Sequence, residues 1–354
     1  MRINWTPLFG VPLHRRLEVL SVAFFVFIFA FLGSISIPII VYLLIAGNNY
    51  WRTVCGLYLA FLIYDRKTGY RGGRGIGKSW VRSWSIWKHA KNYFPIDLVK
   101  TADLPPDRNY LVCVFPHGIF SIGAAANFGT SHSKWSAFYP GIRPRLTTLK
   151  ANTLLPISRE IILSCGVCSA SEDSLTHLLS QSNDPSAKSN RDGYTSNAVA
   201  LIVGGFREVY YTYPDTYRFV VAKRRGLVRV ALQTGASLVP AISFGENNYY
   251  DIVDYNKSGF WRRFIQEICK QKINHFPPII LGRGIFQYNY GLVPRRHPIT
   301  TVIGAPIHLE KIENPSDKEL NETHELFCTG LRKLFDEHKS KYVKNSEDVH
   351  MDLV

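Results

Sequence analysis

A histidine with neighbours suited to acid–base chemistry stands in the segment Phe115–Gly118, directly after an apolar run that begins at Tyr110. A neutral imidazole takes up a proton near pH 7, and a glycine beside it lets the backbone approach a ligand closely. We therefore predict that His117 is a general base, with Pro116 and Asn127 as secondary residues of an acceptor site. The alternative is a structural histidine, which is the commoner role of an isolated Pro-His-Gly segment.

Two glycines and a carboxylate follow a second apolar run, in the segment Gly204–Glu208. The backbone N–H groups of Gly204 and Gly205, with that of Gly118, are candidates to hold an oxyanion. Glu208 is the first candidate for a carboxylate that orients His117 or holds the acceptor, and Glu246 is the second. The alternative for Gly204–Glu208 is a tight turn with a solvated arginine and glutamate.

A group of cations precedes the expected helix that runs to about Thr234, with Gly235 as its stop. The N-terminal dipole and the unpaired N–H groups of a helix add to such charges and favour phosphate binding. The alternative is a solvated basic turn. The cations predicted to bind phosphates are Lys223, Arg224, Arg225 and Arg229, with Arg143 and Arg145 as lesser candidates.

Two further matches are set aside. Residues 72–79 read Gly-Gly-Arg-Gly-Ile-Gly-Lys-Ser, which has P-loop spacing. A working P-loop follows a strand, whereas residues 65–71 are charged and turn-like, and no later strand ends in an aspartate for magnesium. Cys165 and Cys168 lack a second pair at metal spacing, so we predict no metal site.

Short apolar runs bounded by glycine, proline or polar clusters predict the strands that position these residues. Helical patterns lie between them, and the clearest begins at Ser316, which forms a capping box with Glu319, and continues to Lys341. Strands that alternate with helices predict an α/β fold with a largely buried mixed sheet flanked by helices. The expected strands are residues 110–115, 198–203, 217–222, 238–244 and 300–303.

The N-terminal region is apolar enough for a bilayer. No charged residue occurs from Val19 to Ala46, and a shorter apolar run follows from Val54 to Tyr64. We expect a membrane-embedded helical hairpin over residues 19–64, between a cytosolic segment 1–18 and one domain over 65–354. Basic residues flank the pair on both sides, which predicts that both ends are cytosolic. The alternative is a single span with the bulk of the protein across the membrane.

Overall composition adds three limits. The 354 residues are 46% hydrophobic, which is enough to fill a core, and this excludes disorder over most of the chain. The formal net charge of +15 predicts an anionic partner, which is a nucleic acid, an acidic membrane or a phosphorylated ligand. Six cysteines form no dense disulfide framework and indicate a reducing compartment.

Glycosylation triplets begin at Asn4, Asn256 and Asn321, and matter only on the lumenal side.

In this order, the motifs resemble the type-2 diacylglycerol acyltransferase family, which also holds monoacylglycerol and wax-alcohol acyltransferases. The resemblance covers nearly the whole chain. The family's His-Pro-His-Gly signature has Phe115 in place of its first histidine, which leaves His117 as the base; the Phe-Leu-x-Leu pattern of some members is matched only at Phe31–Leu32. Other matching segments are 72–74, 93–95, 139–144, 159–160, 166–168, 204–208, 225–233, 244–246 and 304–307.

A more distant likeness joins the histidine, the Gly-Gly-x-x-Glu segment and Val239-Pro240 to the glycerol-phosphate acyltransferases. In that family an aspartate five residues after the histidine orients it. Ile122 occupies the corresponding position here. The partner of His117 must therefore come from elsewhere in the chain.

The family resemblance implies an acyltransferase that moves a fatty acyl group from coenzyme A to the hydroxyl of diacylglycerol or monoacylglycerol. It implies acyl-CoA as co-substrate, no cofactor, a neutral lipid and membrane lipids as partners, and no nucleic acid; an oligomer is compatible with it. It also implies an endoplasmic reticulum membrane with a cytosolic catalytic domain, or a lipid droplet surface. A wax-alcohol acyltransferase, a non-enzymatic lipid-binding or membrane-shaping protein and a P-loop nucleotidase are the alternatives.

Overall fold

The computed structural model describes residues 4–7, 10–74, 80–187, 190, 192–252 and 280–354. Seven strands form one mixed sheet in the order β1-β10-β7-β2-β5-β3-β4. The strands from β7 to β4 are parallel to one another, whereas β10 is antiparallel to β7. Their bounds are β1 Ile96–Lys100, β2 Tyr110–Phe115, β3 Ile142–Thr148, β4 Cys168–Ser169, β5 Ser196–Ile202, β7 Ser237–Phe244 and β10 Ile299–Ile303.

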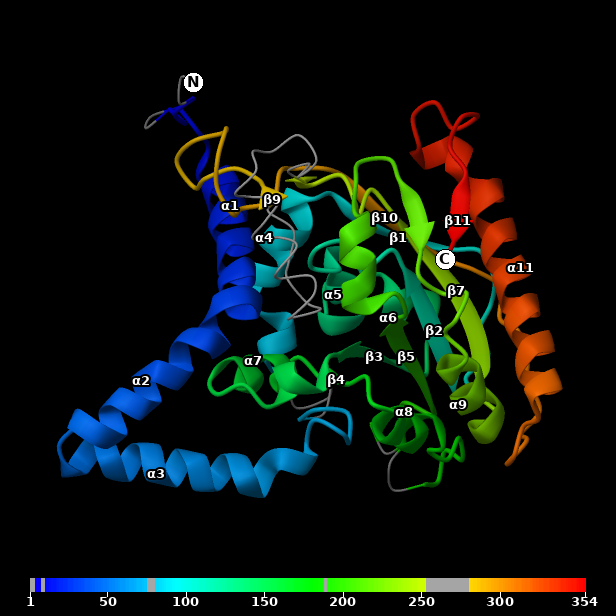
Figure 1. Cartoon of the computed structure of the whole chain (residues 1–354), viewed down its shortest axis with the longest axis horizontal. Helices are drawn as coiled ribbons and strands as arrows, with labels where there is room; N and C mark the ends of the chain where they lie inside the picture. The colour runs from blue at the N-terminus through cyan, green and yellow to red at the C-terminus, as the bar shows by residue number, and fades with distance from the viewer. Residues whose placement is uncertain (1–3, 8–9, 75–79, 188–189, 191, 253–279) are drawn as a thin grey trace, which may run out of the picture.

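Helices cover both faces of this sheet, as the alternation of buried side chains along β2 requires (Figure 1). Tyr110, Val112 and Val114 pack into one core, and the residues between them pack into the other. One face carries α1 (Leu13–Val26), α4 (Ser85–Tyr93), α5 (Ile122–Gly129), α6 (Trp135–Phe138) and α7 (Ser158–Ser164). The other carries α8 (Glu172–Leu179), α9 (Gly226–Thr234) and α11 (Asp317–Tyr342).

Most sequence predictions for this domain are confirmed within two residues. The α/β class, the strand over 110–115 and the capping box at Ser316 are all present. Helix α9 ends at Gly235, whose φ of +71° is a conformation that glycine adopts without strain. The expected strand over 217–222 is shorter, because β6 (Tyr217–Phe219) lies outside the main sheet and pairs with β11 (Met351–Leu353).

The N-terminal region divides differently from the prediction. One helix of 34 residues, Leu13–Ala46, is long and apolar enough to cross a membrane. Its first part, α1, packs on α4 and buries Val19, Val22 and Phe25 in the protein core. The buried Glu18 on this helix pairs with Arg296 of the domain. The segment that begins at Val19 therefore belongs in part to the α/β body.

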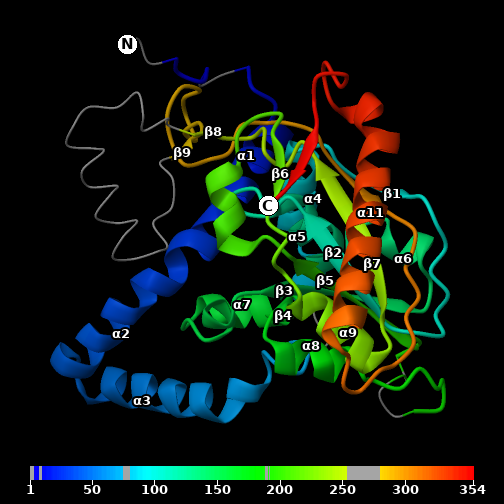
Figure 2. The same cartoon turned by 45° about the vertical axis from the view of Figure 1, so that its right-hand side comes forward.

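The remainder of this region projects from the body as two helices (Figures 1 and 2). A π-helical stretch, η1 (Phe27–Leu32), connects α1 to α2 (Gly33–Ala46), and α3 (Asn49–Tyr64) runs back toward the domain. The side chain of Asn48 caps α3 by accepting a hydrogen bond from the Trp51 N–H, 3.1 Å away. We call α2 and α3 together the arm. The arm covers residues 33–64 of the segment 19–64, for which a membrane-embedded hairpin is predicted, and its insertion in a membrane stays a prediction.

Three further pairs of short elements lie in the described part of the chain. Strands β8 (Asp251–Ile252) and β9 (Ile280–Leu281) pair with each other. Two 3₁₀ segments, η2 (Asp65–Lys67) and η3 (Trp80–Ser83), follow the arm. Two more, η4 (Lys150–Thr153) and η6 (Gly205–Tyr211), follow β3 and β5 at the edge where the parallel strands end.

Candidate active site

Three adjacent parallel strands end at the same edge of the sheet, and each is followed by predicted site residues. In register, Val114 of β2 lies beside Ile202 of β5, and Phe115 lies beside Ile242 of β7. The segments that follow these strands are Pro116–Gly118, Gly204–Glu208 and Gly245–Glu246. The carboxyl edge of an open parallel sheet is where such folds bind ligands.

His117 is half-buried at this edge, and its ring is held by the backbone. Its Nδ1 lies 2.9 Å from the carbonyl oxygen of Gly118. A carbonyl only accepts, so Nδ1 carries the proton and donates it, and Nε2 holds the free lone pair of a neutral imidazole. The orienting partner is therefore a backbone carbonyl, where the sequence had suggested a carboxylate.

The surroundings of His117 favour its neutral form. Burial lowers the pKa of the imidazole below its ordinary value, and the hydrogen bond to the Gly118 carbonyl offsets part of that effect. The ring is consequently unprotonated at pH 7. This is the protonation state that a general base requires.

Glu246 anchors the loop that carries His117. Its carboxylate is 1% exposed and accepts hydrogen bonds from the backbone N–H groups of Ile122, at 2.6 Å, and Gly123, at 2.8 Å. It also accepts one from the Tyr249 hydroxyl at 3.0 Å. Burial raises the pKa of Glu246 to about 7, although the two backbone donors act in the opposite direction. Its oxygens are used at the start of α5, so Glu246 is not the partner of the imidazole.

Tyr249 extends this anchor to the rest of the loop. Its hydroxyl accepts hydrogen bonds from the N–H groups of Ile119, at 3.2 Å, and Phe120, at 3.1 Å. Gly118 has a φ of +59°, and a Cβ there would lie 2.8 Å from Cγ of Glu246. Only glycine allows the backbone after His117 to pass this close to the buried carboxylate.

Glu208 is buried beside the same loop, near the backbone N–H of His117. Its carboxyl group is 1% exposed, and neither oxygen makes a hydrogen bond within the described residues. Burial raises its pKa far above the ordinary value, while the backbone N–H of His117 and the charge of Arg224 lower it. The structure brings Glu208 to the backbone of His117, but not to the ring that the sequence prediction assigned to it.

The two glycines before Glu208 have different surroundings. A Cβ on Gly204 would overlap Oε2 of Glu208, so a side chain at that position is excluded. Gly205 has a φ of +57°, and nothing lies within 4 Å of its Cβ position. The carbonyl of Gly204 accepts a hydrogen bond of 3.2 Å from Arg224. The turn is thus closed on the side of Glu208 and open on the other.

The predicted cations separate into two groups. Lys223, Arg224, Arg225 and Arg229 precede and begin α9, near Gly204, and Lys223 and Arg229 are exposed. Arg143 lies at the other end of the sheet, level with the second residue of β5, where it is buried and pairs with Asp192. Arg145 is buried on β3 and donates to the Gly72 carbonyl. The two β3 arginines are structural here.

The secondary residues are buried as well. Pro116 lies at the end of β2, and Asn127 lies inside α5, where its side-chain oxygen accepts a hydrogen bond of 3.2 Å from Ser133. This contact points to a packing role for Asn127.

An apolar pocket lies between the N-terminal helix and α5, and sequence reasoning missed it. Val22 and Phe25 of α1, Phe29 of η1 and Trp87 of α4 form one side, and the α5 residues form the other. Ile122, the α5 residue that Glu246 holds, is part of the lining. The run of small residues in α5, Gly123-Ala124-Ala125-Ala126, was the available signal in the sequence.

The matches that were set aside show no ligand site in the described ranges. No three His, Cys, Asp or Glu side chains there come together as metal ligands. Cys165 and Cys168 are buried free thiols, and burial raises the pKa of each to about 12. Of the P-loop match, residues 75–79 lie outside the described residues, and Gly73 packs against the backbone of Gly166.

Known proteins are similar to this chain along almost its entire length. The family model described as diacylglycerol acyltransferase matches residues 43–353. The chain is 38% identical over 342 residues to 2-acylglycerol O-acyltransferase 1 from Bos taurus, and this covers 97% of both chains. It is 39% identical to diacylglycerol O-acyltransferase 2 from Xenopus tropicalis, with 92% of this chain and 86% of that protein covered.

A human relative and one solved structure are also similar. Diacylglycerol O-acyltransferase 2 from Homo sapiens is 38% identical, with 93% of this chain and 81% of that protein covered. The crystal structure of the 1-acyl-sn-glycerophosphate acyltransferase PlsC from Thermotoga maritima aligns at 13% identity and a TM-score of 0.38. That alignment covers 92% of this chain and 98% of PlsC.

Proposed function

Because this chain belongs to the diacylglycerol acyltransferase family, we propose that it esterifies the hydroxyl of diacylglycerol or monoacylglycerol with a fatty acyl group from coenzyme A. The observation that carries this proposal is the similarity over nearly the full length of relatives named for these two reactions. The arrangement at the sheet edge supplies the groups that such an acyl transfer needs.

In the proposed mechanism, Nε2 of neutral His117 takes the proton of the acceptor hydroxyl while its oxygen attacks the thioester carbonyl. The new C–O bond forms first, and the tetrahedral intermediate then breaks its C–S bond. The imidazolium returns the proton to the sulfur, so coenzyme A leaves as the free thiol. The Nδ1–H bond to the Gly118 carbonyl supports this scheme because it keeps Nε2 available.

Backbone N–H groups are our candidates for the charge on the tetrahedral oxygen. Gly118, Gly204 and Gly205 follow two adjacent strand ends, and Gly118 and Gly205 have a positive φ, a backbone conformation that glycine adopts without strain. A general base and backbone donors complete this chemistry without a metal or cofactor. Transfer should therefore persist in the presence of a chelator.

The phosphates of coenzyme A are assigned to the cations at the start of α9. Arg224 lies beside Gly204, and Arg225 and Arg229 lie on the first turns of that helix. The apolar pocket beside α5 is the proposed place for a long hydrocarbon chain, because Ile122 joins it to the loop of His117.

The arm is the proposed membrane anchor, with the α/β body on the cytosolic side of the endoplasmic reticulum membrane or at a lipid droplet. Its apolar side chains are exposed, including Ile45, Leu57 and Ile63. A glycan on the triplets at Asn4 or Asn321 in the full-length protein would refute this topology; deglycosylation should leave mobility unchanged. The third triplet, at Asn256, lies outside the described residues.

The experiment that tests the function supplies labelled acyl-CoA to membranes that contain the chain, together with diacylglycerol, monoacylglycerol or a long-chain alcohol. We expect label in triacylglycerol or diacylglycerol and release of coenzyme A in equal amount. A wax ester as the main product would assign the alcohol acceptor instead. If no acceptor yields an ester and no coenzyme A appears, the non-enzymatic alternative replaces this proposal.

A further inference from the structure

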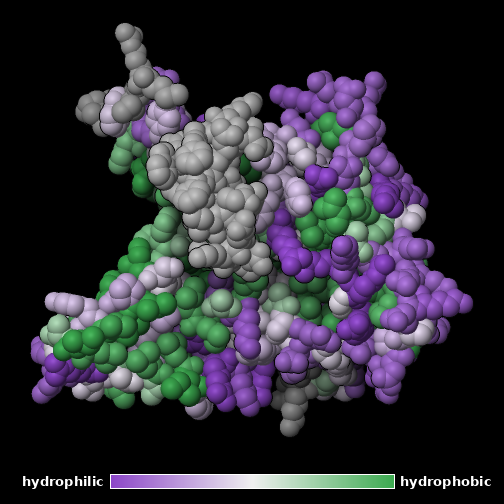
Figure 3. All heavy atoms as spheres, viewed as in Figure 1, coloured by the Kyte–Doolittle hydropathy of each residue, from purple (hydrophilic) through white to green (hydrophobic). Residues whose placement is uncertain are grey.

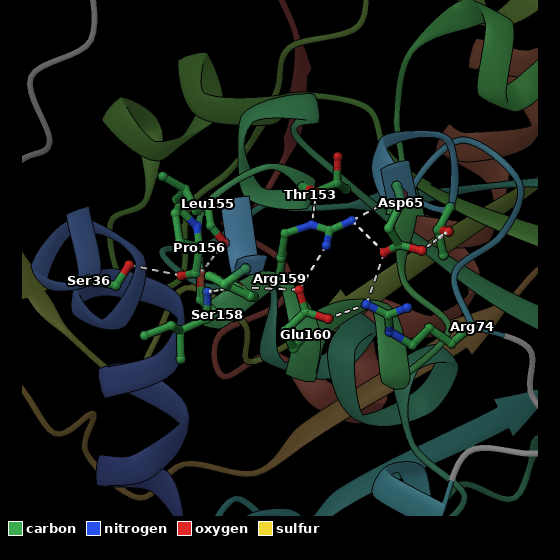
Figure 4. Close-up of polar contacts among 12 residues, drawn as sticks. Ser36, Asp65, Arg74, Thr153, Leu155, Pro156, Ser158, Arg159 and Glu160 are labelled. Carbon is green, nitrogen blue, oxygen red and sulfur yellow. Dashed lines mark hydrogen bonds and ion pairs between the residues drawn. The ribbon is translucent and has the colours of Figure 1, made fainter. Parts of the chain in front are cut away.

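A network of ion pairs fixes the arm to the α/β body (Figure 4). The guanidinium of Arg159, which is 1% exposed, lies 2.9 Å from Asp65 at the end of the arm and 2.8 Å from Glu160. Arg74 pairs with the same two carboxylates. Because both acids are shared by two arginines, neither is left to balance other cations nearby.

The loop between β3 and α7 docks against the arm. The Ser36 hydroxyl donates a hydrogen bond of 2.9 Å to the Pro156 carbonyl, and the Ile157 N–H donates one of 2.7 Å to the Tyr58 hydroxyl. Gly33 leaves room for Leu155, since a Cβ there would lie 2.8 Å from that side chain. The loop therefore shares the environment of the arm. In keeping with this, Leu149, Leu154 and Ile157 are 57%, 44% and 42% exposed.

A groove with four exposed cations opens beside this loop. Arg66 and Lys67 of η2 and Arg71 follow α3, and Lys150 begins η4 after β3. In the part of the chain that the structure describes, none of the four pairs with a carboxylate. Lys150 lies over the Tyr70 ring, with 5.4 Å from Nζ to the ring centroid. The groove is completed by Tyr70, Leu154, Asp173 and His177.

The groove combines a positive charge excess with an apolar edge. It contains four cations and one carboxylate, Asp173, and Leu154 joins it to the exposed apolar loop. Figure 3 shows hydrophobic residues along the arm and hydrophilic residues where the arm meets the body. Cations that follow a membrane helix lie at the depth of the lipid headgroups, where arginine and lysine bind phosphoryl oxygens.

We propose that this groove binds the phosphoryl headgroup of an anionic phospholipid. The four cations contact the phosphoryl group, and Leu149, Leu154 and Ile157 lie among the acyl chains beside it. The proposal rests on insertion of the arm in a bilayer, and not on the acyl-transfer reaction. The headgroup site would hold the body at a fixed height, because the ion-pair network prevents the arm from swinging.

The test measures binding directly in the purified full-length protein in neutral detergent micelles. A short-chain phosphatidylserine is titrated and followed by calorimetry, with short-chain phosphatidylcholine as the neutral comparison. The groove variant replaces four residues, Arg66→Gln, Lys67→Gln, Arg71→Gln and Lys150→Gln. The matched control removes the same charge from exposed positions of α11 and the segment after it, Lys318→Gln, Lys333→Gln, Lys341→Gln and Lys344→Gln.

We expect wild type and control to prefer phosphatidylserine over phosphatidylcholine, and the groove variant to bind phosphatidylserine at least about tenfold more weakly. Equal losses in both variants would mean that net charge alone attracts the lipid, and would overturn the proposal. Unchanged binding by the groove variant would do the same.

A second experiment distinguishes binding of the lipid headgroup from binding of the coenzyme A phosphates. Free coenzyme A is titrated into each variant, and the Michaelis constant for acyl-CoA is measured in neutral lipid. The proposal requires that the groove variant retain the wild-type values for both. If coenzyme A binding weakens at least as much as phosphatidylserine binding, the groove belongs to the donor site and the proposal is wrong. Loss of lipid binding with normal ester formation separates this site from the proposed function.

Discussion

The carboxylate of Glu246 accepts a hydrogen bond of 2.6 Å from the backbone N–H of Ile122. Ile122 is the fifth residue after His117, the position at which the glycerol-phosphate acyltransferase pattern places an aspartate. Here the acid comes from the end of another strand and binds the backbone of that position instead. The carboxylate thus fixes the loop, and the backbone of the loop fixes the imidazole.

The substitution His117→Gln should lower ester formation by about 10² to 10⁴, the usual contribution of a general base. Glutamine keeps a similar size and hydrogen-bonding capacity but cannot take the proton. Turnover is measured at saturating substrates with membrane integration checked in parallel, and exposed His350→Gln serves as control. Retention of more than roughly a tenth of wild-type turnover would show that His117 is structural.

The pH dependence should reflect the lowered pKa of His117. The reference value alone would place the loss of activity near pH 6.5. Because burial lowers the pKa, the neutral base persists to more acidic pH, and activity should fall only below about 6.5. Turnover is followed from neutral to acidic pH, with folding monitored at each point. An acidic limb centred above 6.5 would contradict the buried, neutral imidazole.

Replacement of Glu246 by glutamine should impair positioning rather than donor binding. The amide nitrogen cannot accept from a backbone N–H, so one of the bonds to Ile122 and Gly123 is lost, at a cost of about 1–3 kcal/mol. We expect a lower kcat, an unchanged Michaelis constant for acyl-CoA and a lower Tm. Exposed Glu310→Gln is the control.

The same variant tests the sign of a pH effect on stability. The pKa of Glu246 rises from 4.5 to about 7 on folding, so the folded state binds more protons between these values. The contribution of Glu246 to stability is therefore full below about 4.5 and is lost as pH rises through 7. The Tm of Glu246→Gln should lack this part of the slope. An identical slope of Tm against pH in both proteins would mean that a group other than Glu246 titrates in this range.

Gly204→Ala should be among the most damaging small substitutions in the chain. The added Cβ would lie 1.4 Å from Oε2 and 2.6 Å from Cβ of the buried Glu208. We expect loss of activity, a lower Tm and a free energy of unfolding that is smaller by about 1–3 kcal/mol because of overpacking. Gly56→Ala is the matched control, since nothing lies within 4 Å of its Cβ position. Wild-type behaviour of Gly204→Ala would mean that Glu208 lies elsewhere in solution.

The donor assignment predicts a selective kinetic change. Arg225→Ala with Arg229→Ala should raise the apparent Michaelis constant for acyl-CoA and leave the acceptor dependence largely intact, because only phosphate contacts are removed. Lys333→Ala with Lys341→Ala removes equal charge from α11 as a control. An unchanged dependence on acyl-CoA concentration in folded, membrane-bound protein would mean that other cations bind the phosphates of coenzyme A.

The sequence pattern predicted strands in which every residue is buried, such as β2. The run from Tyr110 to Phe115 is apolar on both faces and bounded by polar residues, so it could only be an interior strand, and its end located His117. Strand β3 was missed because Arg143, Arg145 and Thr147 interrupt its apolar pattern, and their partners are far away in sequence.

Two features of the site were beyond reach from the sequence. A backbone carbonyl orients the imidazole, and every residue has one, so no residue type marks Gly118 for that role. Likewise, the sequence of an apolar helix has the same pattern whether lipid or protein covers the helix. The part of α1 from Val19 was assigned to the bilayer for that reason. Glu18, directly before the apolar run, was the available signal, because a buried carboxylate needs a partner such as Arg296.

The π-helical stretch Phe27–Leu32 has a consequence for the evolution of the arm. A π-helical turn contains an additional residue, and each residue rotates an α-helix by about 100°. Loss or gain of one codon there would therefore turn the arm about its own axis without changing its composition. Such a change would direct another face of α2 toward Pro156 and remove the contact of Ser36. Length variation among natural homologues should accordingly be rare within these six residues and more frequent at the tip around Gly47.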